Sequence, residues 1–235
     1  MDLQVSVIIP ACNAAETLTE TLDSVALQTR QPDEIIVVND GSTDTTAAIA
    51  KAHSLEPKVI STSNQGAAAA LNLGISTATG DVLVFLDADD LWLAEKIELQ
   101  AALLRNEPET GMVFSCMDTF LCPSMPPEAA NRLVFPTGSQ PGYLIGTLMA
   151  RRDIFSRHGL FDPALRTGYF IDWFGQVKGE GAKFRILPQI LLKRRVRQGT
   201  LSQRQSVAGD GLSADFIEIA RRAIERKRKL QQNNP

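Results

Sequence analysis

Acidic side chains follow directly after an apolar run in the first half of the chain. Residues 82–86 are all apolar, and the next four residues are Asp87, Ala88, Asp89 and Asp90. Side chains alternate along an extended segment, so Asp87 and Asp89 are expected on the same side of it. Neighbouring carboxylates repel one another unless a cation lies between them, and their oxygens suit Mg²⁺ or Mn²⁺. The pattern therefore indicates either a metal and phosphate site or a solvated acidic turn that caps a helix beginning near Trp92.

Asp40 is a further candidate, because residues 40–44 read Asp-Gly-Ser-Thr-Asp. Gly41 permits a tight turn, and the hydroxyl groups after it can cap the next helix. Asp40 could instead accept hydrogen bonds from a base or from a ribose hydroxyl, as acidic residues do in dinucleotide-binding folds. The segment taken alone favours capping.

Amide side chains and a glycine mark the beginning of the helix expected after that. Asn64 and Gly66 precede this helix, and Asn72 lies within it. A glycine at this place allows the backbone to approach a ligand closely, with amide groups near the sheet edge. The alternative is an ordinary surface helix that begins at a glycine.

Asp172 lies in an aromatic setting, because residues 169–174 read Tyr-Phe-Ile-Asp-Trp-Phe. A carboxylate beside apolar rings tends to have a raised pKa and could act as a general base. An aspartate at a helix N-terminus, with aromatic neighbours in the core, explains the same pattern.

Basic side chains cluster late in the chain, where residues 193–195 are Lys-Arg-Arg and Arg197 follows. Guanidinium groups pair with phosphate oxygens in a bidentate manner, so Arg195 and Arg197 could neutralise a diphosphate. The alternative is a basic surface strand, on which alternation lets only some of these side chains face one site.

The segments that position these residues alternate between strand and helix patterns. Strands are predicted at residues 5–9, 34–38, 59–60 and 82–86, with helices at 18–27, 45–52 and 66–76. This alternation predicts right-handed βαβ units and a doubly wound, mainly parallel α/β sheet. Ligands bind beyond the carboxyl ends of the strands in such sheets. Asn13, Asp40 and the acidic residues within 87–90 all follow predicted strands at that edge.

The second half of the chain is less regular. Helices are predicted at residues 94–105 and 152–157, and strands at 112–115, 143–150 and 192–196. Residues 121–141 hold much of the proline and are expected to form an irregular functional or mobile loop. An amphipathic helix is predicted at residues 213–230, with a basic end at 226–229 and an apolar stripe of Phe216, Ile217, Ala220, Ala223 and Ile224.

Composition narrows the class of protein. The chain has 235 residues, of which 44% are hydrophobic and 22% charged, so global disorder is excluded. A net charge of −3 argues against a nucleic-acid partner. Neither a membrane-spanning run nor a secretory signal is expected. Cys12, Cys116 and Cys122 fit no metal spacing and are expected to be free thiols of a cytoplasmic protein.

Taken in order, the motifs resemble those of the family 2 glycosyltransferases. The matching segments are residues 5–10 with Asn13, residues 33–44, residues 64–74, and residues 80–90 with Trp92. The similarity covers roughly residues 4–100 and continues more loosely through residues 159–162, 171–173 and 187–191 to about Ser202. Each motif is weak alone, whereas the ordered set at family spacing is specific.

The resemblance implies a GT-A fold that spans residues 1–205 as one domain. Its nucleotide-sugar-binding half is expected at 1–104 and its acceptor-side half at 105–205, with a C-terminal basic amphipathic helix at 206–235. It further implies transfer of a sugar from a nucleotide diphosphate sugar, with a UDP-sugar favoured, to a hydroxyl of a carbohydrate, lipid-linked or protein acceptor. Such transfer usually inverts the anomeric carbon and is assisted here by Mn²⁺ or Mg²⁺.

The resemblance also assigns roles to residues. Asp172 matches the second acid of the family's Glu-Asp pair and is expected to be the catalytic base. Asp87 and Asp89 match the DxD pair that meets the diphosphate and its metal, with Asp90 as an adjoining ligand. The residues expected to bind the nucleotide-sugar are Pro10, Ala11, Cys12, Asn13, Asp40, Asn64, Gly66, Asn72, Asp87, Ala88, Asp89, Arg195 and Arg197.

The sequence departs from the family pattern at four positions. Cys12 replaces a tyrosine that could stack on the base, and Leu71 replaces a basic residue. Ile171 replaces the glutamate of the Glu-Asp pair, and Arg197 occupies the place of a histidine. These departures motivate an alternative function, a degenerate GT-A domain that binds nucleotide-sugar or a partner without turnover.

Two further alternatives concern function and contacts. A nucleotidyltransferase ranks third, because the loop after the first strand lacks the glycine-rich, basic sequence that such enzymes use on triphosphates.

The C-terminal helix is expected to dock on its own domain or on a second copy in a homodimer. Peripheral contact with anionic lipid at the inner face of the membrane is the less favoured alternative.

Overall fold

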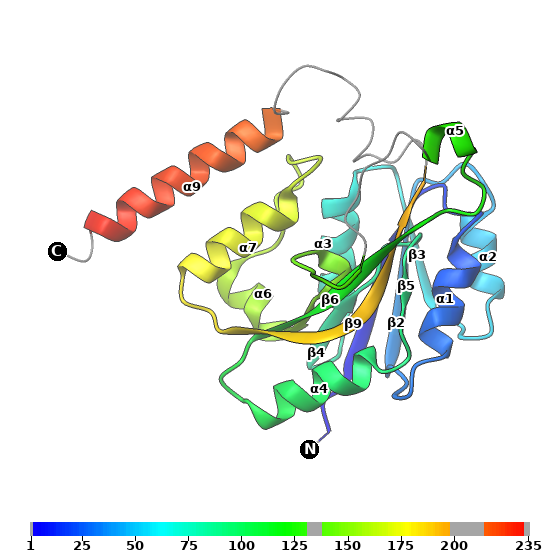
Figure 1. Ribbon diagram of the computed structural model, residues 1–235, viewed down its shortest axis with the longest axis horizontal. Coiled ribbons are helices and arrows are strands. Elements are labelled where there is room, and N and C mark those ends of the chain that lie inside the picture. The colour runs from blue at the N-terminus through cyan, green and yellow to red at the C-terminus, as the bar shows by residue number, and fades with distance from the viewer. Residues whose placement is uncertain (1, 131–137, 198–213, 233–235) are drawn as a thin grey trace.

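The first half of the chain folds into a parallel sheet with helices in between (Figure 1). The structure is a computed structural model that describes residues 2–130, 138–197 and 214–232, with side chains to residue 228. The predicted domain boundary at residues 205 and 206 and the predicted helix start at Ser213 lie outside the described residues.

Four parallel strands form the part of the sheet that the sequence predicts best. They are β1 (Val5–Ala11), β2 (Glu34–Asp40), β3 (Lys58–Thr62) and β4 (Val82–Phe85), in the order β3-β2-β1-β4. The connecting helices are α1 (Leu18–Ala26), α2 (Thr46–Ala52) and α3 (Ala67–Thr77). The predicted βαβ alternation is confirmed.

The second half adds strands of mixed direction. The order continues β4-β8-β6-β9-β5, with β7 (Gln140–Pro141) beside β6. In this part, β8 (Met149–Arg151) runs antiparallel to β4 and β6, whereas β9 (Phe184–Val196) runs parallel to β6 (Met112–Leu121). A short strand β5 (Leu91–Trp92) pairs with β9 directly after the acidic cluster.

Two predicted strands of this half differ from the structure. The strand predicted at residues 143–150 is wrong for most of its length, because Ile145–Thr147 form a 3₁₀ turn, η1, and only β8 is extended. The Thr147 hydroxyl donates to the carbonyls of Gly142 and Leu144, which folds this segment back on itself. The strand predicted at 192–196 is part of the much longer β9, whose pairing with β6 shifts register around Pro188, a residue with no N–H for the ladder.

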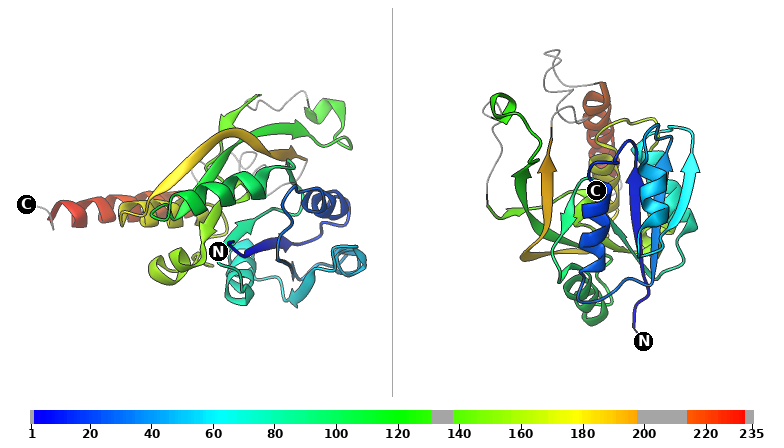
Figure 2. Two further views of the ribbon diagram at one scale, coloured as in Figure 1. Left: turned by 90° about the horizontal axis from the view of Figure 1, so that it is seen from below. Right: turned by 90° about the vertical axis from the view of Figure 1, so that its right-hand side faces the viewer.

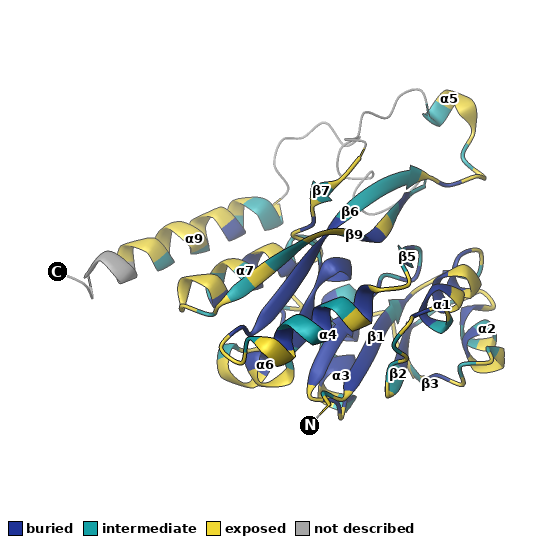
Figure 3. Ribbon diagram, turned by 60° about the horizontal axis from the view of Figure 1, so that its bottom comes forward, coloured by how far each residue is buried: buried dark blue, intermediate teal, exposed yellow. Residues whose placement is uncertain are grey.

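Helices cover both faces of the sheet, as Figure 2 shows. One hydrophobic cluster joins the sheet to α1, α2 and α4 (Lys96–Asn106), and a second joins it to α3, α6 (Arg152–His158) and α7 (Tyr169–Gly179). Val7 of β1 lies in the first cluster and Ile8 in the second, so alternate side chains of one strand serve opposite faces. This two-sided burial explains why the strands read as continuous apolar runs, and Figure 3 shows their buried interior.

The last described helix, α9 (Ala214–Gln232), runs beside α7 and extends past it (Figures 1 and 2). Its contact face is not the predicted apolar stripe. Ile219 is buried and Phe216 half-buried, whereas Ile217 and Ile224 are 59% and 55% exposed. A short helix, α5 (Pro127–Ala130), lies within the loop predicted at residues 121–141. Among the described residues, no helix has both the length and the apolar character needed to cross a membrane.

Candidate active site

The loops after β1 and β2 are tied together at the carboxyl edge of the sheet. Asn13 takes a positive φ of 50°, its backbone N–H donates to the Ser42 hydroxyl at 3.0 Å, and its amide oxygen accepts from the Thr43 N–H at 2.8 Å. This side chain therefore shapes the loop that precedes α2. Pro10 and Ala11 end β1 beside β2, with Ala11 paired to Asn39.

Cys12 lies exposed on this loop. Partial desolvation by the surrounding loop, together with the negative charges of Asp40 and Asp44, raises the pKa of its thiol. The thiol thus stays protonated in neutral solution, and it leaves open the place that the resemblance assigns to a stacking tyrosine.

Asp40 organises the loop in front of α3. Its Oδ1 accepts from the Thr62 hydroxyl and the Gln65 N–H, both at 2.8 Å, and its Oδ2 accepts from the Gly66 N–H at 2.7 Å. Gly41 is required beside it, because a Cβ there would lie 2.5 Å from the backbone nitrogen of Asn64. The carboxylate is 3% exposed and keeps an acceptor position on Oδ2 only.

Asn72 of α3 clamps the segment that precedes α7. Its Nδ2 donates to the Phe161 carbonyl at 2.7 Å, and its Oδ1 accepts from the Phe161 N–H at 3.0 Å. Binding of the donor by Asn72 stays a prediction. In the structure, both polar atoms of this amide contact the backbone of Phe161 and position that segment.

The loop directly after β4 carries three carboxylates, those of Asp87, Asp89 and Asp90, and residues 87–90 are called the acidic loop below. Burial and the charge of Asp89 raise the pKa of Asp87 to about 6, and Arg194 opposes this shift. Asp90 is buried, and its Oδ1 accepts from the backbone N–H of Arg195 at 2.8 Å. This hydrogen bond anchors the loop to β9. Burial and the neighbouring carboxylates raise the pKa of Asp90, and the bond from Arg195 opposes this shift. The Ala88 carbonyl is fixed as well, because it accepts from the Thr17 hydroxyl at 2.8 Å.

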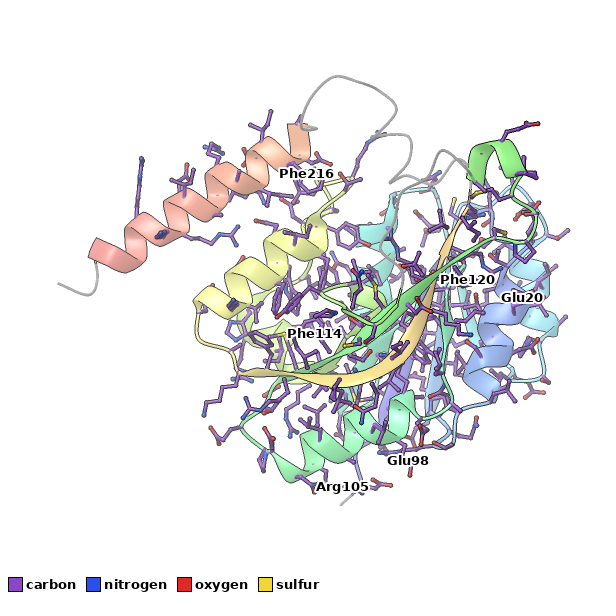
Figure 4. The ribbon with its side chains drawn as sticks, in the orientation of Figure 1. Glu20, Glu98, Arg105, Phe114, Phe120 and Phe216 are labelled. Carbon is purple, nitrogen blue, oxygen red and sulfur yellow. The ribbon has the colours of Figure 1, made fainter. Side chains whose placement is uncertain are left out.

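Arg195 holds the backbone of that loop from β9. Its Nε donates to the Asp89 carbonyl at 2.7 Å, and its Nη2 donates to Glu20 Oε2 at 2.5 Å. The guanidinium is centred 4.7 Å from the Phe120 ring and is almost inaccessible. Figure 4 shows Glu20 and Phe120 near the end of β9. The side chain is therefore a buried positioning group whose donors are engaged by the Asp89 carbonyl and Glu20.

Arg197, two residues further along, meets the carboxylate of the same aspartate. Its Nε lies 3.0 Å from Asp89 Oδ2, and both side chains are partly exposed. Arg197 also lines a cavity of about 120 Å³. Its other lining residues are Glu16, which precedes α1, and Cys122, Ser124, Met125 and Pro126 of the loop after β6. A cation next to Asp89 and an open cavity beside it are suited to an anionic group.

The acidic loop partly fits a divalent cation. Among the described residues, no group of three or more His, Cys, Asp or Glu side chains could hold a metal ion. Asp87 and Asp89 are nevertheless a repelling pair, which is the arrangement that a hard cation relieves. The remaining ligands would have to be phosphate oxygens or water, and Asp90 has one oxygen already engaged by Arg195.

Asp172 lies in the first turn of α7 with its carboxylate covered by α9. Arg222 Nη1 lies 3.0 Å from Asp172 Oδ2, and Arg226 Nη2 donates to Oδ1. Arg226 Nη1 also donates to the Asp172 carbonyl at 2.9 Å. The neighbouring rings of Phe170 and Trp173 lie in the core, which confirms the alternative of an aspartate at a helix N-terminus with aromatic core neighbours. The carboxylate itself faces guanidinium groups and not aromatic rings.

Sequence reasoning missed Arg222, Arg226 and Tyr169. The arginines are four residues apart on one helical face, a spacing that could have signalled a bidentate contact. Tyr169 begins α7, and burial together with the charge of Asp87 raises the pKa of its phenol. The ring of Phe161 lies 6.4 Å from that of Phe85 at the end of β4 and 5.6 Å from that of Tyr169, so the N-terminus of α7 packs near the end of β4.

Comparison with known proteins identifies relatives of the chain. The family model described as Glycosyl transferase family 2 matches residues 6–157. An uncharacterized glycosyltransferase of Rickettsia typhi is 32% identical over 206 residues, which cover 82% of this chain and 64% of that protein. One of Rickettsia felis is 39% identical over 116 residues, covering 48% and 19%. The chain thus spans less than two thirds of the length of these curated relatives.

Solved structures share the fold. TarS of S. aureus, residues 1–349 in complex with UDP-GlcNAc, has a TM-score of 0.75 at 21% identity, over 95% of this chain and 66% of that one. The corresponding complex with UDP has a TM-score of 0.73 at 20% identity, over 95% and 65%.

Proposed function

The chain belongs to glycosyl transferase family 2, and from that premise we propose that it transfers a sugar from a UDP-sugar to an acceptor hydroxyl. The observation that carries the proposal is the placement of Asp87 and Asp89 directly after β4, at the carboxyl edge of the sheet, with Arg197 3.0 Å from Asp89. Ligands bind at this edge in doubly wound sheets. The choice of a uridine donor draws on the UDP and UDP-GlcNAc complexes of TarS.

The donor diphosphate would lie against the acidic loop and Arg197. Breaking the glycosyl–phosphate bond leaves negative charge on the departing UDP, and positive groups stabilise that charge. Arg197 offers one such group. Asp89 and Asp87 would hold Mn²⁺ or Mg²⁺, which when bound supplies Lewis-acid stabilisation of the leaving diphosphate.

Asp172 would act on the acceptor. The acceptor oxygen attacks the anomeric carbon, the bond from that carbon to the phosphate oxygen breaks, and the hydroxyl proton passes to the Asp172 carboxylate. Attack opposite to the leaving group inverts the anomeric centre.

UDP release from UDP-GlcNAc and other UDP-sugars, measured with and without Mn²⁺, tests the proposal. Asp89→Asn should abolish release, whereas Asp153→Asn, an exposed change on α6, should leave it unchanged. Equal rates in the Asp89 variant and wild type would reject the proposed role of the acidic loop.

A domain that binds UDP-sugar without turnover is the second candidate. It is favoured by one contact, the engagement of both Asp172 oxygens by Arg222 and Arg226. Saturable UDP-GlcNAc binding with no product from any donor, in wild type and in the variants described next, would establish it.

A further inference from the structure

The contact between α9 and α7 covers the residue that the proposed function needs as its base. Asp172 has its two carboxylate oxygens on two guanidinium groups, and its side chain is 10% exposed. A base must present an oxygen lone pair to the acceptor hydroxyl. With both oxygens of Asp172 engaged by Arg222 and Arg226, neither oxygen is free to accept that proton.

The contact is built from several independent interactions along one face of α9. At its start, Asp215 Oδ2 accepts from the Thr167 N–H at 2.9 Å and from the Thr167 hydroxyl at 3.1 Å. One turn later, Ile219 packs on Gly168, where an added Cβ would lie 2.5 Å from the Ile219 Cδ1. Phe216 lies at the same end of α9, above the N-terminus of α7 (Figure 4).

The arginines continue the same face. Arg222 pairs with Asp172 and also with Asp162 at 2.9 Å, and Arg226 follows four residues later. The helix thus contacts Asp162, the turn at Thr167 and Gly168, and the first turn of α7 at Asp172.

The contact is nevertheless of a reversible kind. Arg222 and Arg226 have side chains that are 30% and 28% exposed, so water and salt reach the ion pairs. Few apolar side chains of α9 are buried in it, because Ile217 and Ile224 remain exposed. The described part of α9 carries six basic and three acidic residues. Other anions can therefore compete with Asp172 for the arginines of α9.

We propose that α9 is an autoinhibitory latch, in which Arg222 and Arg226 occupy Asp172 and must leave it before an acceptor hydroxyl can be deprotonated. This inference rests on the proposed function, since it takes Asp172 as the base. Release of the latch exposes the carboxylate and leaves the sheet and the acidic loop as they are.

Hydrolysis of UDP-GlcNAc in Mn²⁺, with water as the acceptor, tests the latch in the full chain. The double variant Arg222→Ala/Arg226→Ala should hydrolyse the donor about fivefold faster than wild type, the factor typical of partly exposed ion pairs. The matched control is Arg221→Ala/Arg228→Ala, which removes the same charge from exposed positions of α9.

Hydrogen exchange of the same proteins supplies a readout that does not depend on activity. Amides of residues 168–172 should exchange faster in the Arg222/Arg226 variant than in the control, while the strands keep their protection. Equal exchange at these residues would overturn the latch, because the arginines would then not hold α9 on α7. A rate of hydrolysis below that of wild type would also overturn it, because the arginines would then orient the base.

A locked variant provides the converse test. Thr167→Cys/Asp215→Cys joins two side chains that are already in hydrogen-bond contact, and oxidation should fix α9 in place and suppress hydrolysis until a reductant is added. Wild type treated with the same oxidant and reductant controls for the native cysteines. Full activity of the oxidised form would contradict the latch and leave the proposed function standing, whereas silence of every protein in every state would reject both.

Discussion

At the scale of single residues, Asp172 connects the expected chemistry to a contact that the sequence does not reveal. Its position in the first turn of α7 suits a base, and its partners in the structure are arginines of α9. The carboxylate therefore has a proposed catalytic role and an ion-paired state in the structure. Substitution of Asp172 tests the role, and substitution of Arg222 and Arg226 tests the ion pairs.

Asp172→Asn should lower transfer or donor hydrolysis by about 10²- to 10⁴-fold, the usual contribution of a positioned base. Donor affinity should change little, because the substitution removes a proton acceptor and no predicted phosphate ligand. Calorimetric titration with UDP-GlcNAc and a UDP-release assay measure the two effects. Glu180→Gln, an exposed change that affects the pair with His158, is the control; an equal loss of donor affinity in Asp172→Asn would reject the assignment.

Cys12 suggests a gain of affinity through substitution. Its side chain is exposed on the loop after β1, where the family resemblance places a ring against the base. Cys12→Tyr should tighten UDP binding by about 1–3 kcal/mol if the phenol stacks on uracil. Cys12→Ser, which supplies no ring, should bind UDP as wild type does, and unchanged affinity in the tyrosine variant would argue that the base lies elsewhere.

At the scale of elements, α4 places a fully buried lysine under the second half of the sheet. Lys96 Nζ donates to Gln100 Oε1 at 2.8 Å and to the Thr147 carbonyl at 3.0 Å, and it lies 5.3 Å from the centre of the Trp92 ring. Burial lowers the pKa of Lys96 well below its usual 10.5. The amine ties α4 and η1 together near the acidic loop.

This burial predicts a pH dependence of stability. Between the lowered folded pKa and 10.5, the unfolded chain binds a proton at Lys96 that the folded protein does not. The free energy of unfolding should therefore rise with pH in that window, by up to about 1.4 kcal/mol per pH unit from this group. Lys96→Met should flatten the rise in urea titrations, whereas Lys51→Met on the exposed face of α2 should not. The same slope in Lys96→Met would show that other groups cause it.

At the scale of the whole molecule, donor binding should couple to folding. The loops after β1, β2 and β4 are held by contacts between distant segments, such as Asp40 with Gly66 and Arg195 with Asp89. A ligand that binds only this assembled edge stabilises the protein by about 2.7 kcal/mol at a concentration of 100 Kd. UDP-GlcNAc with Mn²⁺ should raise the melting temperature of wild type.

A matched variant makes that measurement specific. Asp89→Asn should lose the additional shift caused by Mn²⁺, while Asp153→Asn should keep it. A shift of equal size with Mn²⁺ and with a chelator would argue against metal assistance and would favour Arg197 as the charge that meets the diphosphate.

Much of the fold follows from local pattern. The strands β1, β2 and β4 are mostly apolar segments followed by polar residues, and such segments predict buried parallel strands. The second half was less predictable, because Pro188 interrupts the pattern of β9 and the segment before β8 satisfies its hydrogen bonds within a turn. These outcomes depend on neighbours that are distant in the sequence.

The amino-acid sequence by itself determined which side chains come to the carboxyl edge of the sheet, since strand order and alternation place Asp40, Asp87 and Asp89 there. Only the tertiary structure decided which contacts the candidate residues make. Asp40 accepts hydrogen bonds that shape a loop, Arg195 holds the backbone of Asp89, and Asp172 faces α9. The physical reason is that position along a strand is a local property of the backbone. The partner of a buried charge, in contrast, comes from a segment far away in the chain, and its identity sets the charge's role.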